Sequence, residues 1–206
     1  MIAVIDYGAG NLQSVKKALD FIGCENIASG NGDDIAAADA IILPGVGSFG
    51  DAMASLKGKG LDRVIEREIA NGKQFLGICL GLQLLFEGSE ETPGVSGLGI
   101  LKGKIQKIPK AQGIKVPHMG WNSLEITNPS GVFEGVRNGD FVYFVHSYYL
   151  TADNPSDVSA RTFYSVPIDA AVCKDNVSAV QFHPEKSGEC GLQMLRNFVK
   201  MAGGNR

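Results

Sequence analysis

Short apolar runs that alternate with helically spaced apolar residues constrain the fold of this chain more than any other feature. Three such runs occupy the first half, at residues 2–6, 40–43 and 74–78. Stretches in which apolar residues recur every three or four positions follow them, at 12–22, 61–69 and 81–86. Runs this short fit buried strands, and the repeat fits amphipathic helices. The alternation predicts an α/β fold with a mostly parallel sheet and helices on both faces.

The second half of the chain has a different character. Its apolar runs are rich in β-branched and aromatic residues and are separated by Asn, Asp, Pro and Gly, at 105–108, 141–145, 158–163, 170–173 and 177–182. They predict additional, partly antiparallel strands, and helical spacing between 192 and 202 predicts a closing helix. Because the sequence contains no repeat, linker or low-complexity segment, we expect one domain, 1–206.

Composition and charge exclude several classes of function. A net charge of −3 offers no basic cluster for a nucleic acid. The apolar runs are too short to span a bilayer, and the N-terminus lacks the regions of a signal peptide, so we expect a cytoplasmic protein without membrane contact. The four cysteines form no CxxC pair and have no His at metal-ligand spacing. Free thiols and no metal site are therefore expected.

The segment Gly77-Ile78-Cys79-Leu80-Gly81 joins an apolar strand directly to a predicted helix. Flanking glycines allow a tight turn that exposes the central residue at the carboxyl end of a sheet, where ligands bind in open α/β folds. A helix N-terminus after Cys79 favours its thiolate form. The segment predicts a nucleophile elbow, although taken alone it also fits a buried structural cysteine.

The segment Gln181-Phe182-His183-Pro184-Glu185 supplies the groups that a thiolate nucleophile needs. A base must accept and return the proton, and a third group must orient the base. Residues two apart in an extended segment point the same way, and Pro184 is expected to keep the segment extended. We therefore expect Glu185 to hold the imidazole of His183. Taken alone, the pair also fits a histidine at a strand end beside a solvated carboxylate.

Two glycine-rich segments follow predicted strands. Pro44-Gly45-Val46-Gly47 can aim backbone N–H groups at a developing oxyanion, and the N–H of Leu80 is the natural second donor. Taken alone, this segment also fits an ordinary turn. Gly8-Ala9-Gly10 resembles the start of a dinucleotide loop, but Gln13 replaces the third small residue. Asn11 as a helix cap is the simpler interpretation there.

Together these residues resemble the class I, or triad-type, glutamine amidotransferases. That family has a doubly wound α/β sheet, and its triad joins a Cys in a Gly-x-Cys-x-Gly elbow to a distant His-x-Glu. In this chain the pattern falls on Gly77–Gly81 and on His183–Glu185. The resemblance implies that Cys79, His183 and Glu185 are the catalytic residues that release ammonia from glutamine.

Several further segments narrow the resemblance, at 6–12, 44–47, 77–91, 117–122, 143–148 and 181–188. They are similar to the glutaminase subunits of imidazole glycerol phosphate synthase, an enzyme of histidine biosynthesis. The resemblance implies a heterodimer with a (β/α)₈-barrel cyclase subunit, which receives the ammonia through a tunnel. The products implied are imidazole glycerol phosphate and aminoimidazole carboxamide ribonucleotide. No cofactor or metal is implied. The dissimilar segments 26–34 and 153–156 are expected at the surface.

The resemblance also implies roles for individual residues. Substrate binding is expected from Gly47, Leu80, Gln83, Glu91, Ser147 and Tyr148. The partner interface or the ammonia exit is expected to involve Asn11, His118, Trp121 and Asn122. The chemistry agrees, because an α-amino group needs a carboxylate such as Glu91 and an α-carboxylate needs N–H and O–H donors. His146 is expected to be a structural histidine near the site.

Three alternatives stay open from the sequence. The first is a related amidotransferase that serves another acceptor, which the segments 6–12 and 117–122 disfavour. The second is a cysteine peptidase or hydrolase on the same type of fold. The third is a catalytically inactive regulatory subunit, which the intact set of Cys79, His183 and Glu185 disfavours.

Overall fold

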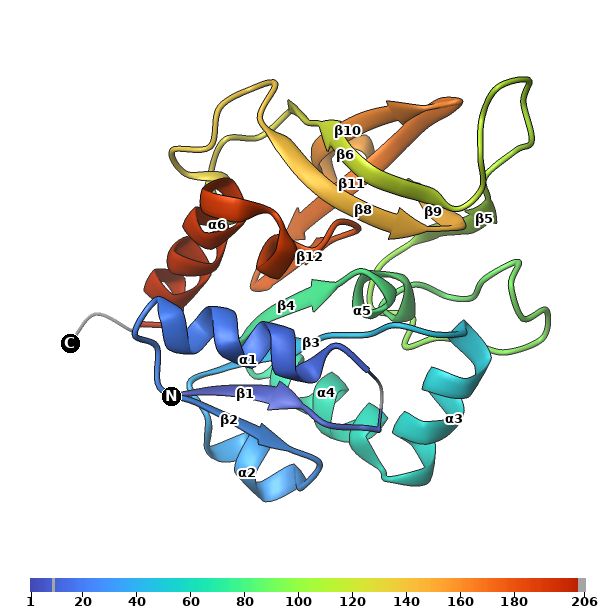
Figure 1. The fold of residues 1–206 in the computed structure, drawn as a ribbon. Helices are drawn as coiled ribbons and strands as arrows, with labels where there is room; N and C mark the ends of the chain where they lie inside the picture. The colour runs from blue at the N-terminus through green and yellow to red at the C-terminus, as the bar shows by residue number, and fades with distance from the viewer. Residues whose placement is uncertain (9, 204–206) are drawn as a thin grey trace.

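The computed structural model describes residues 1–8 and 10–203, and an eight-stranded sheet forms its centre (Figure 1). In spatial order the strands are β2 (Asn26–Ser29), β1 (Ile2–Ile5), β3 (Ala40–Leu43), β4 (Gln74–Ile78), β12 (Val177–Val180), β11 (Val166–Lys174), β10 (Val158–Tyr164) and β7 (Glu125–Ile126). The first five strands run parallel, and the pairings from β12 to β7 are antiparallel. The predicted change in character between the two halves is confirmed.

Two smaller antiparallel sheets accompany the large one. One pairs β5 (Gly103–Lys107) with β9 (Tyr148–Ala152), and the other pairs β6 (His118–Ser123) with β8 (Phe141–His146). Figure 1 shows all four strands on the same side of the molecule as β10 and β11. The two small sheets therefore lie beyond the parallel part of the large sheet, on the side of its antiparallel strands.

Helices cover both faces of the parallel part. Buried residues of α1 (Leu12–Phe21) and α6 (Gly188–Met201) pack on one face. The other face carries α2 (Gly32–Ala37), α3 (Phe49–Gly58), α4 (Leu61–Ala70) and α5 (Leu80–Leu84). Three short 3₁₀ turns complete the structure: η1 (Gly131–Phe133), η2 (Pro155–Asp157) and η3 (Pro184–Lys186). No helix within the described residues is both long enough and apolar enough to cross a membrane.

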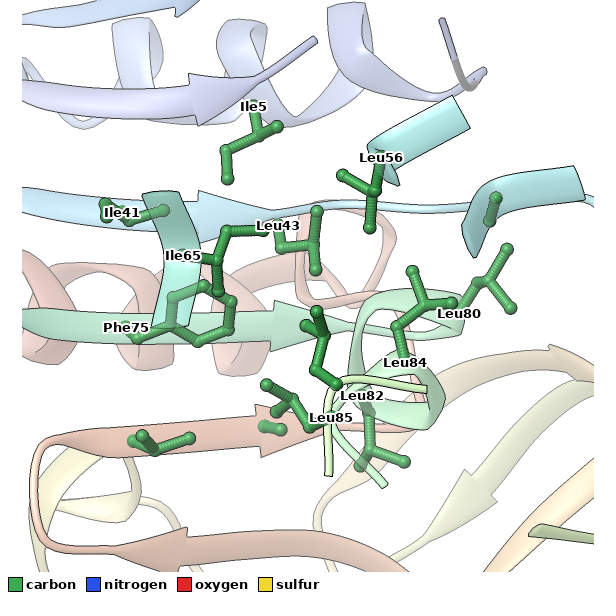
Figure 2. Close-up of a cluster of buried hydrophobic side chains, with 14 of the residues drawn as sticks. Ile5, Ile41, Leu43, Leu56, Ile65, Phe75, Leu80, Leu82, Leu84 and Leu85 are labelled. Carbon is green, nitrogen blue, oxygen red and sulfur yellow. The ribbon is translucent and has the colours of Figure 1, made fainter. Parts of the chain in front are cut away.

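The central strands divide their side chains between two cores. Ile41 and Leu43 join the core under α3 and α4, whereas Ile42 joins the core under α1 and α6. This alternation is the period-two geometry of a strand that is buried on both faces. Figure 2 shows the first core, in which Phe75 from β4 lies among the side chains of Ile41, Ile65 and Leu82.

Several elements differ from the sequence predictions. The segment 26–34 is half-buried or exposed apart from Ser29, as expected, but it also contains the edge strand β2 and the start of α2, which were not predicted. The strand β2 has polar residues at both ends and is mostly half-buried, so its apolar pattern is weak. The helix α3 was also not predicted, although Ser48 caps it by accepting from the N–H of Asp51. Ala9, within the dinucleotide-like segment, lies outside the described residues.

The topology brings the predicted functional segments to one edge of the sheet. β1, β3, β4 and β12 are parallel neighbours, so their carboxyl ends lie at the same edge. The segments that follow these strands carry Asn11, the Pro44–Gly47 loop, Cys79 and His183, respectively. In particular, Ile78 pairs with Val180, so the residues after β4 and β12 emerge side by side.

Candidate active site

Cys79 occupies a strained turn between β4 and α5. Its backbone has a φ of 55° and a ψ of −107°, a conformation rare for a residue with a side chain. The N–H of Cys79 still continues the sheet by donating to the carbonyl of Val180 at 2.8 Å. The elbow predicted from the sequence is therefore present in the structure.

Gly77 and Gly81 make this turn possible because a side chain at either position would collide with backbone. A Cβ atom on Gly81 would lie 1.9 Å from the carbonyl oxygen of Leu43, and one on Gly77 would lie 2.8 Å from that of Gly81. The strand and the helix can thus approach closely only with glycine on both sides of Cys79.

His183 and Glu185 form a buried pair beside the elbow. His183 Nδ1 lies 2.7 Å from Glu185 Oε1, and both side chains are 0% exposed. The backbone N–H of His183 donates to the carbonyl of Tyr143 on β8 at 2.9 Å, and the hydroxyl of Ser187 donates to the carbonyl of His183 at 2.7 Å. The ring is thus held from both its backbone and its Nδ1 side.

The local conformation of this pair differs from the prediction. Glu185 lies in the 3₁₀ turn η3 rather than in an extended segment, and Pro184 is the first residue of that turn. The fixed φ of proline suits the first position of a helical turn as well as an extended strand. The predicted contact between the two side chains is present, but a turn produces it.

Asn11 completes this cluster from the other end of the chain. Its Nδ2 donates to Glu185 Oε1 at 2.7 Å and lies 3.3 Å from His183 Nδ1. Asn11 was expected to cap the helix that follows it and to lie at the partner interface or the ammonia exit. It does stand at the N-cap position of α1, but its side chain makes no capping hydrogen bond and contacts His183 and Glu185 instead. The contact arises because the start of α1 packs against the turn η3, which the sequence pattern does not indicate.

The surroundings of His183 favour its charged form. Burial lowers the pKa of His183, but interactions with Cys79 and with Glu185 outweigh it and raise the pKa from 6.5 to about 9. Its Nε2 atom is buried and has no hydrogen-bond partner within residues 1–8 and 10–203. Nε2 is therefore the ring nitrogen left to exchange a proton at the Cys79 sulfur.

A cavity of about 280 Å³ opens at the elbow. All six predicted substrate-binding residues line it together with Cys79, namely Gly47, Leu80, Gln83, Glu91, Ser147 and Tyr148. Four further residues line the wall: Val46 from the predicted oxyanion loop, His146, which was expected near the site, and Pro117 and Val145, which had no predicted role there. The structure brings the predicted set to one place, while the role of each member stays a prediction.

Two polar side chains of the cavity wall are already partly engaged. Glu91 Oε2 accepts from the N–H of Phe49 at 2.8 Å, at the N-terminus of α3, which leaves its other oxygen available. Gln83 Nε2 donates to the carbonyl of Tyr148 at 3.1 Å and to Gln181 Oε1 at 3.0 Å. Gln83 can therefore offer a ligand only its own oxygen.

The structure places the two predicted oxyanion donors, Gly47 and Leu80, in different backbone surroundings. Gly47 has a φ of 105°, which a residue with a side chain would rarely adopt. The N–H of Leu80, however, donates to the carbonyl of Gly45 at 3.3 Å. The Pro44–Gly47 loop must move that carbonyl away before Leu80 can donate to a substrate oxygen.

The residues assigned to the partner interface divide between surface and interior. Trp121 is 55% exposed, and its neighbour Met119, which was not predicted, is 60% exposed. His118 is only 3% exposed, and its ring lies between those of Phe144 and Tyr164, at centroid distances of 4.6 and 3.9 Å. Strand alternation along β6 explains the difference, because Met119 and Trp121 point away from the side that His118 occupies.

The remaining two members lie at intermediate depth. Asn11 and Asn122 are both half-buried. Asn122 Nδ2 donates to the carbonyl of Phe163 at 3.0 Å and lies 3.4 Å from His118 Nε2.

His146, which was expected to be a structural histidine near the site, is buried. Its two ring nitrogens lie within hydrogen-bond distance of His118 and of the carbonyl of Tyr148. Within the described part of the chain, no group of three His, Cys, Asp or Glu side chains could hold a metal ion.

Comparison with known proteins gives a consistent result. Residues 3–202 match the family described as Glutamine amidotransferase class-I. "Imidazole glycerol phosphate synthase subunit HisH" of Methanothermobacter thermautotrophicus is 51% identical over 201 residues, which cover 98% of each chain. The subunit of the same name from Aquifex aeolicus is 50% identical over 97% of this chain and 96% of its own length.

Solved structures support the fold at much lower sequence identity. A structure described as "Structure of PurLQS from Thermotoga maritima" matches with a TM-score of 0.77 and 23% identity, over 97% of each chain. Another, described as "Crystal structure of glutamine amidotransferase", matches with a TM-score of 0.77 and 20% identity, over 98% of this chain and all of the other. The predicted α/β architecture is confirmed.

Proposed function

The chain belongs to the class-I glutamine amidotransferase family, and from that premise we propose that it is the glutaminase subunit of an imidazole glycerol phosphate synthase. It hydrolyses glutamine to glutamate and ammonia, and a cyclase subunit uses the ammonia to make imidazole glycerol phosphate and aminoimidazole carboxamide ribonucleotide. We take residues 1–206 as one glutamine amidotransferase domain. The observation that carries the proposal is the buried His183–Glu185 pair beside the Cys79 elbow, at the cavity lined by the predicted substrate-binding residues.

Glutamine is held in this cavity with its carboxamide at Cys79. The free oxygen of Glu91 and the Oε1 atom of Gln83 are acceptors suited to the α-amino group. Ser147 and Tyr148 line the same wall and offer donors for the α-carboxylate. This arrangement leaves the side-chain carbonyl of the substrate near the Pro44–Gly47 loop and the N-terminus of α5.

Catalysis begins when the Cys79 thiolate attacks the carboxamide carbon. The carbonyl π bond opens to an oxyanion, which N–H groups of the Val46–Gly47 loop and of Leu80 stabilise. His183 gives its Nε2 proton to the leaving nitrogen, the C–N bond breaks, and ammonia departs from a thioester on Cys79. The neutral imidazole then accepts a proton from water, whose oxygen attacks the thioester. Glutamate leaves as the C–S bond breaks.

The contact between Gly45 and Leu80 supplies a reason why the isolated subunit should be nearly inactive. While the carbonyl of Gly45 accepts from the N–H of Leu80, one oxyanion donor is occupied. Rotation of a peptide in this glycine-flanked loop frees the donor, and docking of the partner favours the rotated state. Turnover of glutamine should therefore rise strongly on addition of the partner, and high turnover without the partner would contradict this part of the proposal.

The second subunit is a (β/α)₈ barrel that receives the ammonia, and the two subunits form a heterodimer. The exposed side chains of Met119 and Trp121 on β6 offer an apolar anchor for it. Asn11 and Asn122 lie at intermediate depth and are the polar members of the assigned interface. Co-purification with a different synthase would reject this partner and favour an amidotransferase for another acceptor.

Replacing Cys79 by Ala tests the function as a whole. The variant, mixed with the candidate barrel subunit, should lose all synthesis from glutamine, because nothing else supplies the nucleophile. Synthesis from added ammonium should continue at the wild-type rate, since the cyclase reaction needs only ammonia. Retained glutamine hydrolysis in Cys79→Ala would reject the assignment of the nucleophile.

A further inference from the structure

The amide of Gln181 contacts the sulfur of the nucleophile. Gln181 Nε2 donates to Cys79 Sγ at 3.6 Å, and the residue is 0% exposed. Its backbone N–H donates to the carbonyl of Ala170 on β11 at 2.8 Å, so the main chain of Gln181 is anchored to the sheet. We propose that Gln181 is a further catalytic residue, the side-chain donor that holds the Cys79 sulfur as a thiolate. This inference rests on the proposed function.

The neighbouring Gln83 determines which end of the Gln181 amide faces the sulfur. The carbonyl of Tyr148 can only accept, so Gln83 must present its NH₂ group there, at 3.1 Å. The second hydrogen of that group then donates to Gln181 Oε1 at 3.0 Å. Gln181 is thereby left with its own NH₂ group toward Cys79. The orientation of this amide follows from the network as a whole, because reversing it would set two donors against each other.

A second branch of the network binds the same carbonyl of Tyr148. His146 Nδ1 lies 2.8 Å from the carbonyl of Tyr148 and must therefore carry a hydrogen. His146 Nε2 then accepts from His118 Nδ1 at 3.0 Å. Burial lowers the pKa of His118 to about 4 and that of His146 to about 3, so both rings are neutral at pH 7. The carbonyl that orients Gln83 thus has two permanent donors.

Two groups at the sulfur favour opposite protonation states. The carbonyl of Val145 lies 3.9 Å from Cys79 Sγ and can accept from the thiol, but it would repel a thiolate. The N–H of Gln181 does the reverse, because a hydrogen bond to a charged acceptor is stronger than one to a neutral acceptor. His183 and Tyr7 interact electrostatically with Cys79, and Glu91, His146 and Tyr148 share the cavity wall with it. A change at Gln181 leaves all of these titratable groups in place.

The test is the pH dependence of Cys79 alkylation in Gln181→Met, which keeps the length of the side chain and removes the donor. Iodoacetamide labelling would be followed at the peptide that contains Cys79, so that the other three cysteines do not contribute. We expect the labelling midpoint to move upward by about one pH unit. Glutamine turnover with the partner should fall about tenfold, with ammonium-dependent synthesis unchanged. Gln74→Met is the matched control, because Gln74 begins β4 at the end away from Cys79.

A folded Gln181→Met protein with the wild-type labelling midpoint would overturn the proposal and leave Gln181 a packing residue. If this variant does not fold, Gln181→Leu replaces it, since leucine is uncharged, has no N–H group and adds no negative charge beside the sulfur. The same upward shift is then expected, and an unshifted midpoint overturns the proposal. Labelling of Cys79 needs no glutamine, so wild-type protein that hydrolyses none would reject the proposed function and not this inference.

Discussion

Replacing Glu185 by Gln separates the charge of the carboxylate from its ability to orient His183. The pair is 2.7 Å apart and both side chains are fully buried, so water cannot substitute for the lost charge. A hydrogen bond to a charged group contributes about 1.5–3 kcal/mol. If that contribution is lost in the transition state, the rate of glutamine hydrolysis falls by about 10- to 150-fold.

The contact with Asn11 limits the loss to this range. Asn11 Nδ2 donates to Oε1 of residue 185 at 2.7 Å, the same atom that faces His183 Nδ1. In Glu185→Gln the N–H of Asn11 still needs an acceptor, so the amide oxygen stays in place and Nδ1 keeps its hydrogen. Removing Asn11 as well frees the amide to rotate and present NH₂ to Nδ1. His183 then adopts the wrong tautomer, and the rate of glutamine hydrolysis is expected to fall by about 10⁴-fold.

The assay is glutamine-dependent turnover with the barrel subunit present, with ammonium-dependent synthesis as the control for folding and docking. We expect Glu185→Gln to lose about 10- to 150-fold and Asn11→Ala/Glu185→Gln to lose about 10⁴-fold, more than the product of the single effects. A loss near 10⁴-fold in Glu185→Gln alone would show that Asn11 does not fix the amide. An unchanged rate would show that Glu185 does not orient the base.

Three further predictions concern stability and docking. Tyr7→Phe should raise the free energy of unfolding by about 1 kcal/mol, because the buried hydroxyl has no hydrogen-bond partner among the described residues; destabilisation in a denaturant titration would contradict this. The pKa of His183 is raised from 6.5 to about 9 in the folded protein. Protonated His183 therefore stabilises the fold fully below about pH 6.5, and this contribution is lost as the pH rises through about 9. Denaturant titrations across this window should show that loss in the wild type and not in His183→Gln. Trp121→Ala should weaken partner binding by about 2 kcal/mol in calorimetry, whereas Phe21→Ala, at an exposed aromatic on α1, should not; equal affinities would remove Trp121 from the interface.

Much of the fold could be predicted because its signals are local. The runs at 40–43 and 74–78 are strands over the predicted residues. Each is buried on both faces, so nearly every position is apolar and the pattern is unmistakable. The edge strand β2 escaped prediction because only one neighbour and part of one face bury it, and few apolar residues are then required.

The elbow at Cys79 was likewise determined by the local sequence. The close approach of strand and helix demands glycine at positions 77 and 81, and nothing larger fits. The contacts around the elbow are of another kind, because they join residues far apart in the sequence. Asn11 and Glu185 are 174 residues apart, and Gln181 and Cys79 are 102 residues apart. No spacing rule along the chain connects such pairs.

The sequence by itself therefore determined the central buried strands, the nucleophile turn and the candidate reacting groups, since each follows from residues adjacent along the chain. Only the tertiary structure decided that Asn11 holds Glu185, that His118 is buried while Trp121 is exposed, and that the N–H of Leu80 is occupied by Gly45. These outcomes depend on which carboxyl ends meet at one sheet edge and which side of β6 packs inward. Both are properties of packing between distant segments, which a local pattern does not encode.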